Sequence, residues 1–163
     1  MSKDGFKWTK EPTFSSEQAD KLNLDGMDSA MREVEFLMDR IAHQEFLKEN
    51  ENVVCDRYIW SGLAYCKVFN PSVFDFIKVL YHHNYFRKPD LYVFVDTPPE
   101  ICCQRRRIPA QFSNLVKLRN AFIETKPLIS NYSTVFTLDT EEGTKNLDEL
   151  TEMVFKRIEI LNG

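Results

Sequence analysis

The sequence contains few glycines, and none of them stands in a phosphate-binding loop. The chain of 163 residues has five glycines, and no glycine is followed directly by lysine. A loop of the form Gly-x-x-x-x-Gly-Lys-Ser/Thr, whose backbone amides hold the phosphates of ATP, is therefore absent from this sequence. An ATP site of that kind is excluded within these residues.

Long apolar runs and patterned cysteines are also missing. No run approaches the roughly 20 residues that cross a bilayer, and the first residues lack the apolar core of a signal peptide. A net charge of −4 gives no indication of a nucleic-acid or membrane partner. The cysteines lack the spacing of a disulfide framework, which predicts reduced thiols in the cytoplasm. They are Cys55, Cys66, Cys102 and Cys103.

What the chain does contain predicts a globular α/β protein. Hydrophobic residues make up 43% of the sequence, and the length suits one domain over residues 1–163. Short apolar runs predict strands at 6–10, 52–55, 91–95 and 134–138. Helical spacing predicts helices at 28–49, 61–68, 72–85, 101–107, 115–128 and 144–161. This alternation predicts three layers, with a parallel sheet between two layers of helices.

Acidic residues follow the predicted strands. Because right-handed crossovers place the carboxyl ends of parallel strands at one edge, we expect these residues to share a rim. They are Glu11, Asp56, Asp96 and Asp139. Aspartate after a strand is also a common turn residue, so the rim alone does not define a site.

The stretch "DRYIWS" supplies the sharpest candidate site. Arg57 at a strand end suits bidentate capture of a phosphate. Asp56 beside it suits a magnesium-bound water or a proton transfer. The alternative is a structural ion pair between these two side chains. Tyr65 follows Ser61 by four residues and would face the same pocket, against a sugar, although a core position fits it equally.

A second candidate lies on the preceding helix, in "FLMDR". Phe36 and Arg40 are four residues apart and share one helical face. An aromatic ring and a guanidinium on one face can stack on a base and hydrogen-bond to it. The alternative places Phe36 in the core and Arg40 in solvent.

Together these pieces resemble the thymidylate kinases. "DRYIWSGLAY" is similar to that family's Asp-Arg-Tyr-x-x-Ser motif, and "FLMDR" to its Phe-x-x-Asp-Arg helix. "KPDLYVFVDTPPEICCQRR" resembles its Pro-Asp-Leu strand, helix start and following arginine. "TKEPT" resembles its Arg-Glu-Pro turn, with Lys10 in place of arginine. The matches occur in family order.

The resemblance implies a binding site for dTMP. Phe36 would stack on thymine, and Arg40 would reach the edge of the base. Arg57 would bind the monophosphate, while Asp56 would serve Mg²⁺ through water and the proton network. The remaining substrate-binding residues would be Pro12 as a wall of the base pocket, Ser61, and Tyr65 favouring deoxyribose.

The resemblance also implies an arginine lid at about 104–114, with Arg106 as a catalytic group. The candidates for phosphate contact are Arg105, Arg106, Arg107 and Arg119. The bland alternative for the arginine run is a set of cations that complements the dipole at a helix end. The departure of "RRRIPAQFSNLVKLRN" from the family pattern leaves open which arginine touches phosphate.

The P-loop kinase-like fold implied by the resemblance lacks its first strand, loop and helix here. Either the strands at 52–55 and 91–95 pair, another segment fills the gap, or the chain is part of a longer product. We expect dTMP to become dTDP with Mg-ATP when the loop is present, and little or no activity from this chain alone. The alternatives are a nucleotide-binding module without kinase activity and a related kinase with another base preference. The family is typically dimeric, so the resemblance implies a possible homodimer, with the apolar stretch 31–47 as its interface or as part of the core.

Overall fold

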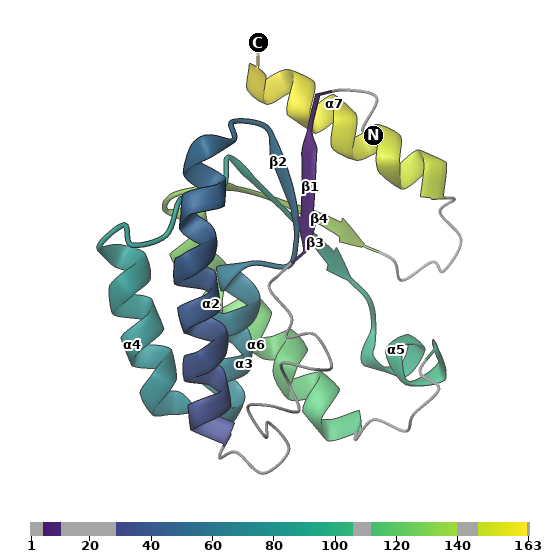
Figure 1. Cartoon of the computed structure of the whole chain (residues 1–163). Coiled ribbons are helices and arrows are strands. Elements are labelled where there is room, and N and C mark those ends of the chain that lie inside the picture. The colour runs from purple at the N-terminus through teal and green to yellow at the C-terminus, as the bar shows by residue number, and fades with distance from the viewer. Residues whose placement is uncertain (1–4, 11–28, 106–111, 140–146, 163) are drawn as a thin grey trace. The chain divides into compact units, whose positions relative to one another are not determined.

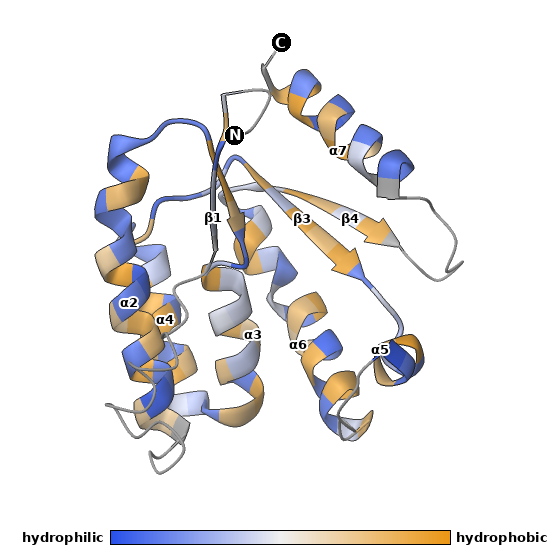
Figure 2. Ribbon diagram, turned by 45° about the vertical axis from the view of Figure 1, so that its right-hand side comes forward, coloured by the Kyte–Doolittle hydropathy of each residue, from blue (hydrophilic) through white to orange (hydrophobic). Residues whose placement is uncertain are grey.

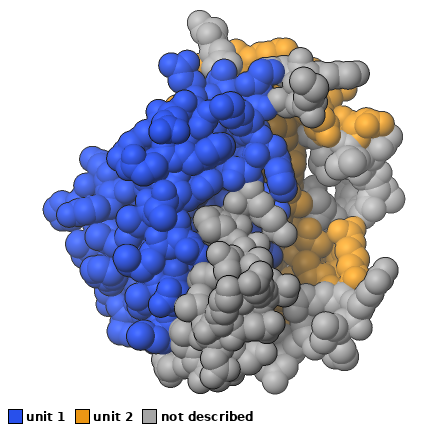
Figure 3. All heavy atoms as spheres, viewed as in Figure 1, with its two compact units in different colours: residues 1–87 blue, residues 88–163 orange. Residues whose placement is uncertain are grey.

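Strands alternate with helices along the computed structural model, which describes residues 5–10, 29–105, 112–139 and 147–162 (Figure 1). Contacts divide the chain into two compact units, residues 1–87 and 88–163, coloured separately in Figure 3. Unit 1 contains β1 (Lys7–Lys10), α2 (Ser29–Glu49), β2 (Val53–Asp56), α3 (Ile59–Phe69) and α4 (Pro71–His82). Unit 2 contains β3 (Leu91–Asp96), α5 (Pro99–Arg105), α6 (Phe112–Ser130), β4 (Thr134–Asp139) and α7 (Leu147–Asn162). All the predicted strands and helices are confirmed, with small shifts at their ends.

The strands of each unit pair in parallel, as predicted. In unit 1 the register places Lys10 opposite Asp56, and in unit 2 it places Asp96 opposite Asp139. The carboxyl ends of the two strands in each unit therefore lie side by side, and polar residues occupy these ends. The strands described form two sheets of two strands each, β1 with β2 and β3 with β4.

The apolar runs of β2 and β3 are of the kind that a parallel sheet buries, but at least one valine on each strand is exposed. The exposed fractions are 46% for Val54 on β2 and 53% for Val95 on β3. A parallel strand becomes fully buried only when neighbours and helices cover it on all sides. A sheet of two strands gives each strand a neighbour on one side only, which leaves part of its apolar surface accessible.

Helical periodicity builds the core of unit 1. The buried face of α2 repeats every three or four residues: Leu37, Arg40, Gln44 and Leu47. Helix α3 carries pale and orange segments in the hydropathy colouring of Figure 2, and most of its residues are buried. Pro71 begins α4, where its fixed φ suits a first helical position, and the buried residues follow at intervals of four. They are Val73, Ile77 and Tyr81.

Unit 2 has a smaller core between α6 and its two strands. Ala121, Thr125 and Ile129 form the buried stripe of α6. The ring of Phe122 stacks on Phe94 of β3, with centroids 5.4 Å apart. The Thr125 hydroxyl donates a hydrogen bond to the Ala121 carbonyl at 2.7 Å, so this buried polar group is satisfied within the helix.

The carboxyl end of α2 is capped by a side chain from the end of unit 1. The Arg87 guanidinium donates to the carbonyl of Leu47, to that of Asn50 at 2.7 Å and to that of Glu51 at 3.2 Å. Helix ends leave carbonyl groups without partners, and a cation there also complements the helix dipole. Arg87 therefore connects the end of α2 to the segment after α4.

We expect Arg87→Met to lower the free energy of unfolding by about 1–3 kcal/mol, because several carbonyls lose a charged donor. Urea denaturation followed by circular dichroism measures this change. Lys48→Met is the matched control, since Lys48 lies on the same helix end and makes only an exposed ion pair with Glu45. The control should change stability by less than about 0.5 kcal/mol. Equal effects of the two substitutions would contradict the capping role of Arg87.

Candidate functional site

The turn after β2 holds the strongest candidate residues of unit 1. Arg57 has φ of 66°, in the left-handed region, between the strand end at Asp56 and the first turn of α3. A non-glycine residue in this region costs roughly 1–2 kcal/mol, and such residues concentrate at functional sites. The side chains of Asp56 and Arg57 are exposed. Within the described residues no ion pair joins them, which does not support the structural alternative.

Phe36 and Arg40 lie together on α2. The Arg40 Cζ atom is 5.9 Å from the centroid of the Phe36 ring, a cation–π distance. Arg40 is only 5% exposed, so the alternative of a solvated Arg40 is wrong. The Phe36 ring is half-buried, so part of it is accessible to a ligand. Burial holds the guanidinium in one place, which a donor for base recognition requires.

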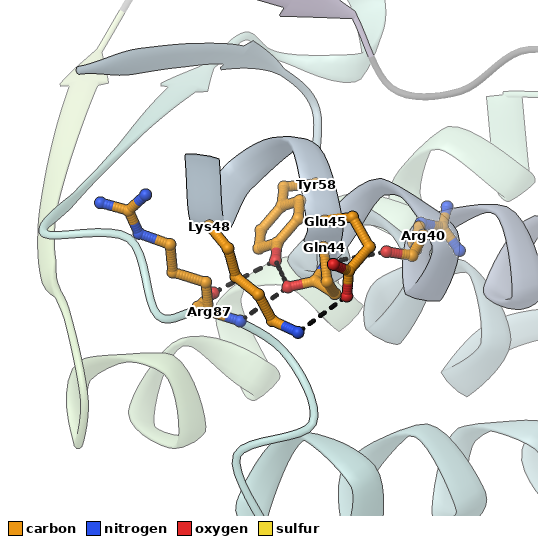
Figure 4. Close-up of polar contacts among 6 residues, drawn as sticks. All are labelled: Arg40, Gln44, Glu45, Lys48, Tyr58 and Arg87. Atoms are coloured by element: carbon orange, nitrogen blue, oxygen red, sulfur yellow. Dashed lines mark hydrogen bonds and ion pairs between the residues drawn. The ribbon is translucent and has the colours of Figure 1, made fainter. Parts of the chain in front are cut away.

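A buried hydrogen-bond network joins the turn to α2, and the sequence did not reveal it (Figure 4). The Tyr58 hydroxyl lies 3.1 Å from Gln44 Oε1 and 3.2 Å from the Arg87 carbonyl oxygen. The Arg87 backbone N–H donates to Gln44 Oε1 at 2.8 Å. Gln44 Nε2 in turn donates to the Arg40 carbonyl at 2.7 Å. Figure 4 shows the Arg40 guanidinium extending away from this network.

The phenol of Tyr58 stays protonated at neutral pH, so its hydrogen bonds in the network persist. Burial raises the pKa of the Tyr58 phenol to about 12, although the hydrogen bond with Gln44 opposes that rise. The hydroxyl therefore keeps its proton and can act as a hydrogen-bond donor.

The only signal for this network in the sequence was the spacing of Arg40 and Gln44, which are four residues apart on one face of α2.

Ser61 and Tyr65 lie on α3, directly after the turn. The Ser61 backbone N–H donates to the Tyr58 carbonyl at 2.9 Å and closes the first turn of the helix. Both side chains are half-buried. The Tyr65 ring has its centroid 6.2 Å from that of Phe69. The structure thus gathers five predicted residues on α2, the turn and α3 of unit 1, together with Asp56.

Unit 2 holds the remaining described candidates, Arg105 and Arg119. Arg105 is exposed at the end of α5. Arg119 on α6 forms a bidentate ion pair with Asp96 at the end of β3, with distances of 2.7 Å from Nε to Oδ1 and 2.9 Å from Nη2 to Oδ2. This pair gives Arg119 a structural role beside its predicted contact with phosphate. Pro12, Arg106 and Arg107 lie outside the described residues.

The described residues contain no group of three or more His, Cys, Asp or Glu side chains that could hold a metal ion. Magnesium is commonly bound by one or two carboxylates together with waters and substrate phosphates, so the exposed Asp56 fits such a role. The loop that would hold the phosphates of ATP is absent from the sequence, so a site of that kind is incomplete in this chain. No described helix is long and apolar enough to cross a membrane.

Comparison with known proteins places this chain among thymidylate kinases. The profile of the thymidylate kinase family matches residues 9–150. The probable thymidylate kinase of Methanocaldococcus jannaschii is 30% identical over an alignment of 134 positions, which covers 74% of this chain and 68% of that protein. The probable thymidylate kinase 1 of Saccharolobus solfataricus is 26% identical over an alignment of 132 positions, which covers 76% of this chain and 65% of that protein. The chain thus spans about two thirds of these relatives.

Solved structures show the same fold. Thymidylate kinase from Candida albicans has a TM-score of 0.68 at 22% identity, covering 96% of this chain and 80% of that one. Thymidylate kinase from Ehrlichia chaffeensis has a TM-score of 0.60 at 20% identity, covering 98% of this chain and 82% of that one. The fold is therefore an α/β fold of the P-loop kinase type, as predicted. The chain belongs to the thymidylate kinase family.

The left-handed backbone at Arg57 generates a prediction that separates function from stability. Glycine adopts positive φ without strain, so we expect Arg57→Gly to leave the free energy of unfolding unchanged or raise it by up to about 1 kcal/mol. The same substitution should weaken the binding of a nucleoside monophosphate at least tenfold. Thermal denaturation and calorimetric titration measure the two effects. A loss of more than 1 kcal/mol of stability would show that the arginine side chain is structural.

The ion pair of Arg119 with Asp96 generates a second prediction. The two side chains are 33% and 16% exposed, so we expect Arg119→Met to destabilise the chain by about 1–3 kcal/mol. The control is Lys117→Met, which removes an exposed cation from the same helix and should cost less than about 0.5 kcal/mol. Chemical denaturation measures both. Unchanged stability in Arg119→Met would contradict the structural role of this ion pair.

Proposed function

We propose that unit 1 carries the nucleoside monophosphate site of a thymidylate kinase and binds dTMP. The observation that carries this proposal is the pairing of Phe36 with a buried Arg40 on α2, which hydrogen bonds connect to the turn that bears Arg57. This arrangement offers a ring for the base, a donor for its edge and a cation for its phosphate. Membership of the thymidylate kinase family supports the same assignment.

The chemistry of Arg40 favours a base with carbonyl oxygens. A guanidinium carries only donors and keeps its charge at all ordinary pH values. Thymine presents the O4 acceptor at the edge where cytosine presents an amino donor. Arg40 is therefore complementary to thymine and leaves the cytosine amino group opposite another donor. Stacking on Phe36 adds affinity without distinguishing between the two pyrimidines.

In this proposal the turn after β2 binds the phosphate, and α3 contacts the sugar. Arg57 binds the monophosphate, because its exposed guanidinium presents a planar pair of donors. Asp56 serves a magnesium-bound water and the proton network at the phosphate. Ser61 and Tyr65 contact the sugar side, where the tyrosine ring favours deoxyribose. Pro12 walls the base pocket, and Arg105, Arg106 and Arg107 act as the lid, with Arg119 as a further phosphate contact.

The complete reaction in this proposal transfers the γ-phosphoryl group of Mg-ATP to dTMP and yields dTDP. Phosphoryl transfer depends mainly on positioning and charge neutralisation, so a chain without the phosphate-binding loop should transfer very slowly. The absent loop also favours a second candidate function, a module that binds the monophosphate without kinase activity. Adding a segment that carries the loop distinguishes the two, because only a kinase gains activity in a coupled assay.

We expect the chain to bind dTMP at least tenfold more tightly than dCMP, and to show no saturable binding of ATP. Isothermal titration calorimetry of the full chain with each nucleotide tests this directly. Tighter binding of dCMP would favour a related kinase with another base preference. Absence of binding by every monophosphate would overturn the proposed site.

Phe36→Ala should weaken dTMP binding by about 10- to 100-fold, because stacking of a base on an aromatic ring contributes roughly 1–3 kcal/mol. Phe76→Ala is the matched control, since Phe76 on α4 is 54% exposed and lies outside the proposed site. The control should bind dTMP like the unsubstituted chain. Equal binding by both variants would contradict the stacking role of Phe36.

A further inference from the structure

Gly62 stands on α3 where a side chain at this position would require the Arg40 guanidinium to shift. A Cβ atom placed on Gly62 would lie 2.9 Å from Arg40 Nη1 and 3.2 Å from Arg40 Cζ. Gly62 is itself buried in the middle of the helix. Glycine is less favourable than alanine inside a helix, so helix formation gives no reason for a glycine at this position. The close approach of the guanidinium gives one.

The surroundings of Arg40 are packed, so an added side chain at position 62 would move its guanidinium from its present place. Its guanidinium is near the Phe36 ring on α2, and the whole residue is 5% exposed. Cys66, one helical turn after Gly62, is completely buried, and its thiol donates to Glu33 Oε2 at 3.5 Å. A methyl group at position 62 would therefore displace the guanidinium rather than be accommodated beside it.

We propose that Gly62 is a positioning residue, whose missing side chain sets the place of the Arg40 guanidinium and thereby the choice of base. The inference rests on the proposed function for its ligand, a pyrimidine monophosphate with a carbonyl group at the edge that Arg40 reaches. Gly62 itself touches no ligand in this proposal. Its contribution passes entirely through Arg40, so its effect must vanish when Arg40 is removed.

A double-mutant cycle tests the proposal on the full chain, with Gly62→Ala, Arg40→Ala and the combination of both. Calorimetry with dTMP and with dCMP, and thermal denaturation, are measured for each variant. Gly62→Ala should weaken dTMP binding about tenfold and lower the preference for dTMP over dCMP by a similar factor. In the Arg40→Ala background the same substitution should leave dTMP affinity unchanged and raise the melting temperature, because only the gain in helix propensity remains.

The outcomes separate this proposal from the proposed function. Unchanged affinity and base preference in Gly62→Ala overturn the positioning role, although dTMP binding itself then stands. If Gly62→Ala fails to fold, recovery of folding in the double variant supports the proposal, and failure of both overturns it. If the unsubstituted chain does not bind dTMP, the proposed function fails. The thermal cycle then still tests the pairing, because additive changes in melting temperature would contradict it.

Discussion

The candidate site depends on the buried contact between Tyr58 and Gln44. Tyr58 follows the strained turn at Arg57, and Gln44 lies one helical turn after Arg40, so this contact connects the two halves of the site. Inside a protein such a bond is strong, and an unpaired partner there is costly. The turn and α2 are therefore held together by buried polar groups, which would be left without partners if the two separated. Arg87 completes the same network through its backbone and caps α2 through its side chain.

Arg40 and Arg57, both in unit 1, have the same side chain in two different environments, and the proposed function assigns them different roles. Arg40 is buried, close to an aromatic ring and opposite a glycine, so its position is determined by packing. Arg57 is exposed on a strained turn, so its position is determined by the backbone. A buried guanidinium suits discrimination between neutral base edges, whereas an exposed one suits a charged phosphate that arrives from solvent. The positive φ at Arg57 and the glycine at position 62 each carry an intrinsic conformational cost.

The sequence predicted the elements well because each carries its own periodicity. Regular spacing of apolar residues marked α2, and apolar runs marked the strands. The exposure of Val54 and Val95 was not predictable, because the exposure of a strand depends on which strands and helices lie beside it. The ion pair of Arg119 with Asp96 joins residues 23 positions apart, and no local pattern indicates such a contact. The same holds for Tyr58 and Gln44, which meet only because α2 packs beside the turn.

The amino-acid sequence by itself determined the α/β class, the order of elements, the family and the residue types available at the site. These properties follow from local periodicity and from short motifs, so they survive without knowledge of the packing. Only the tertiary structure decided that Arg40 is buried, that Gly62 faces it, and that a hydrogen-bond network joins the turn to α2. The physical reason is that each of these facts concerns the space between two elements, and the packing of the elements defines that space.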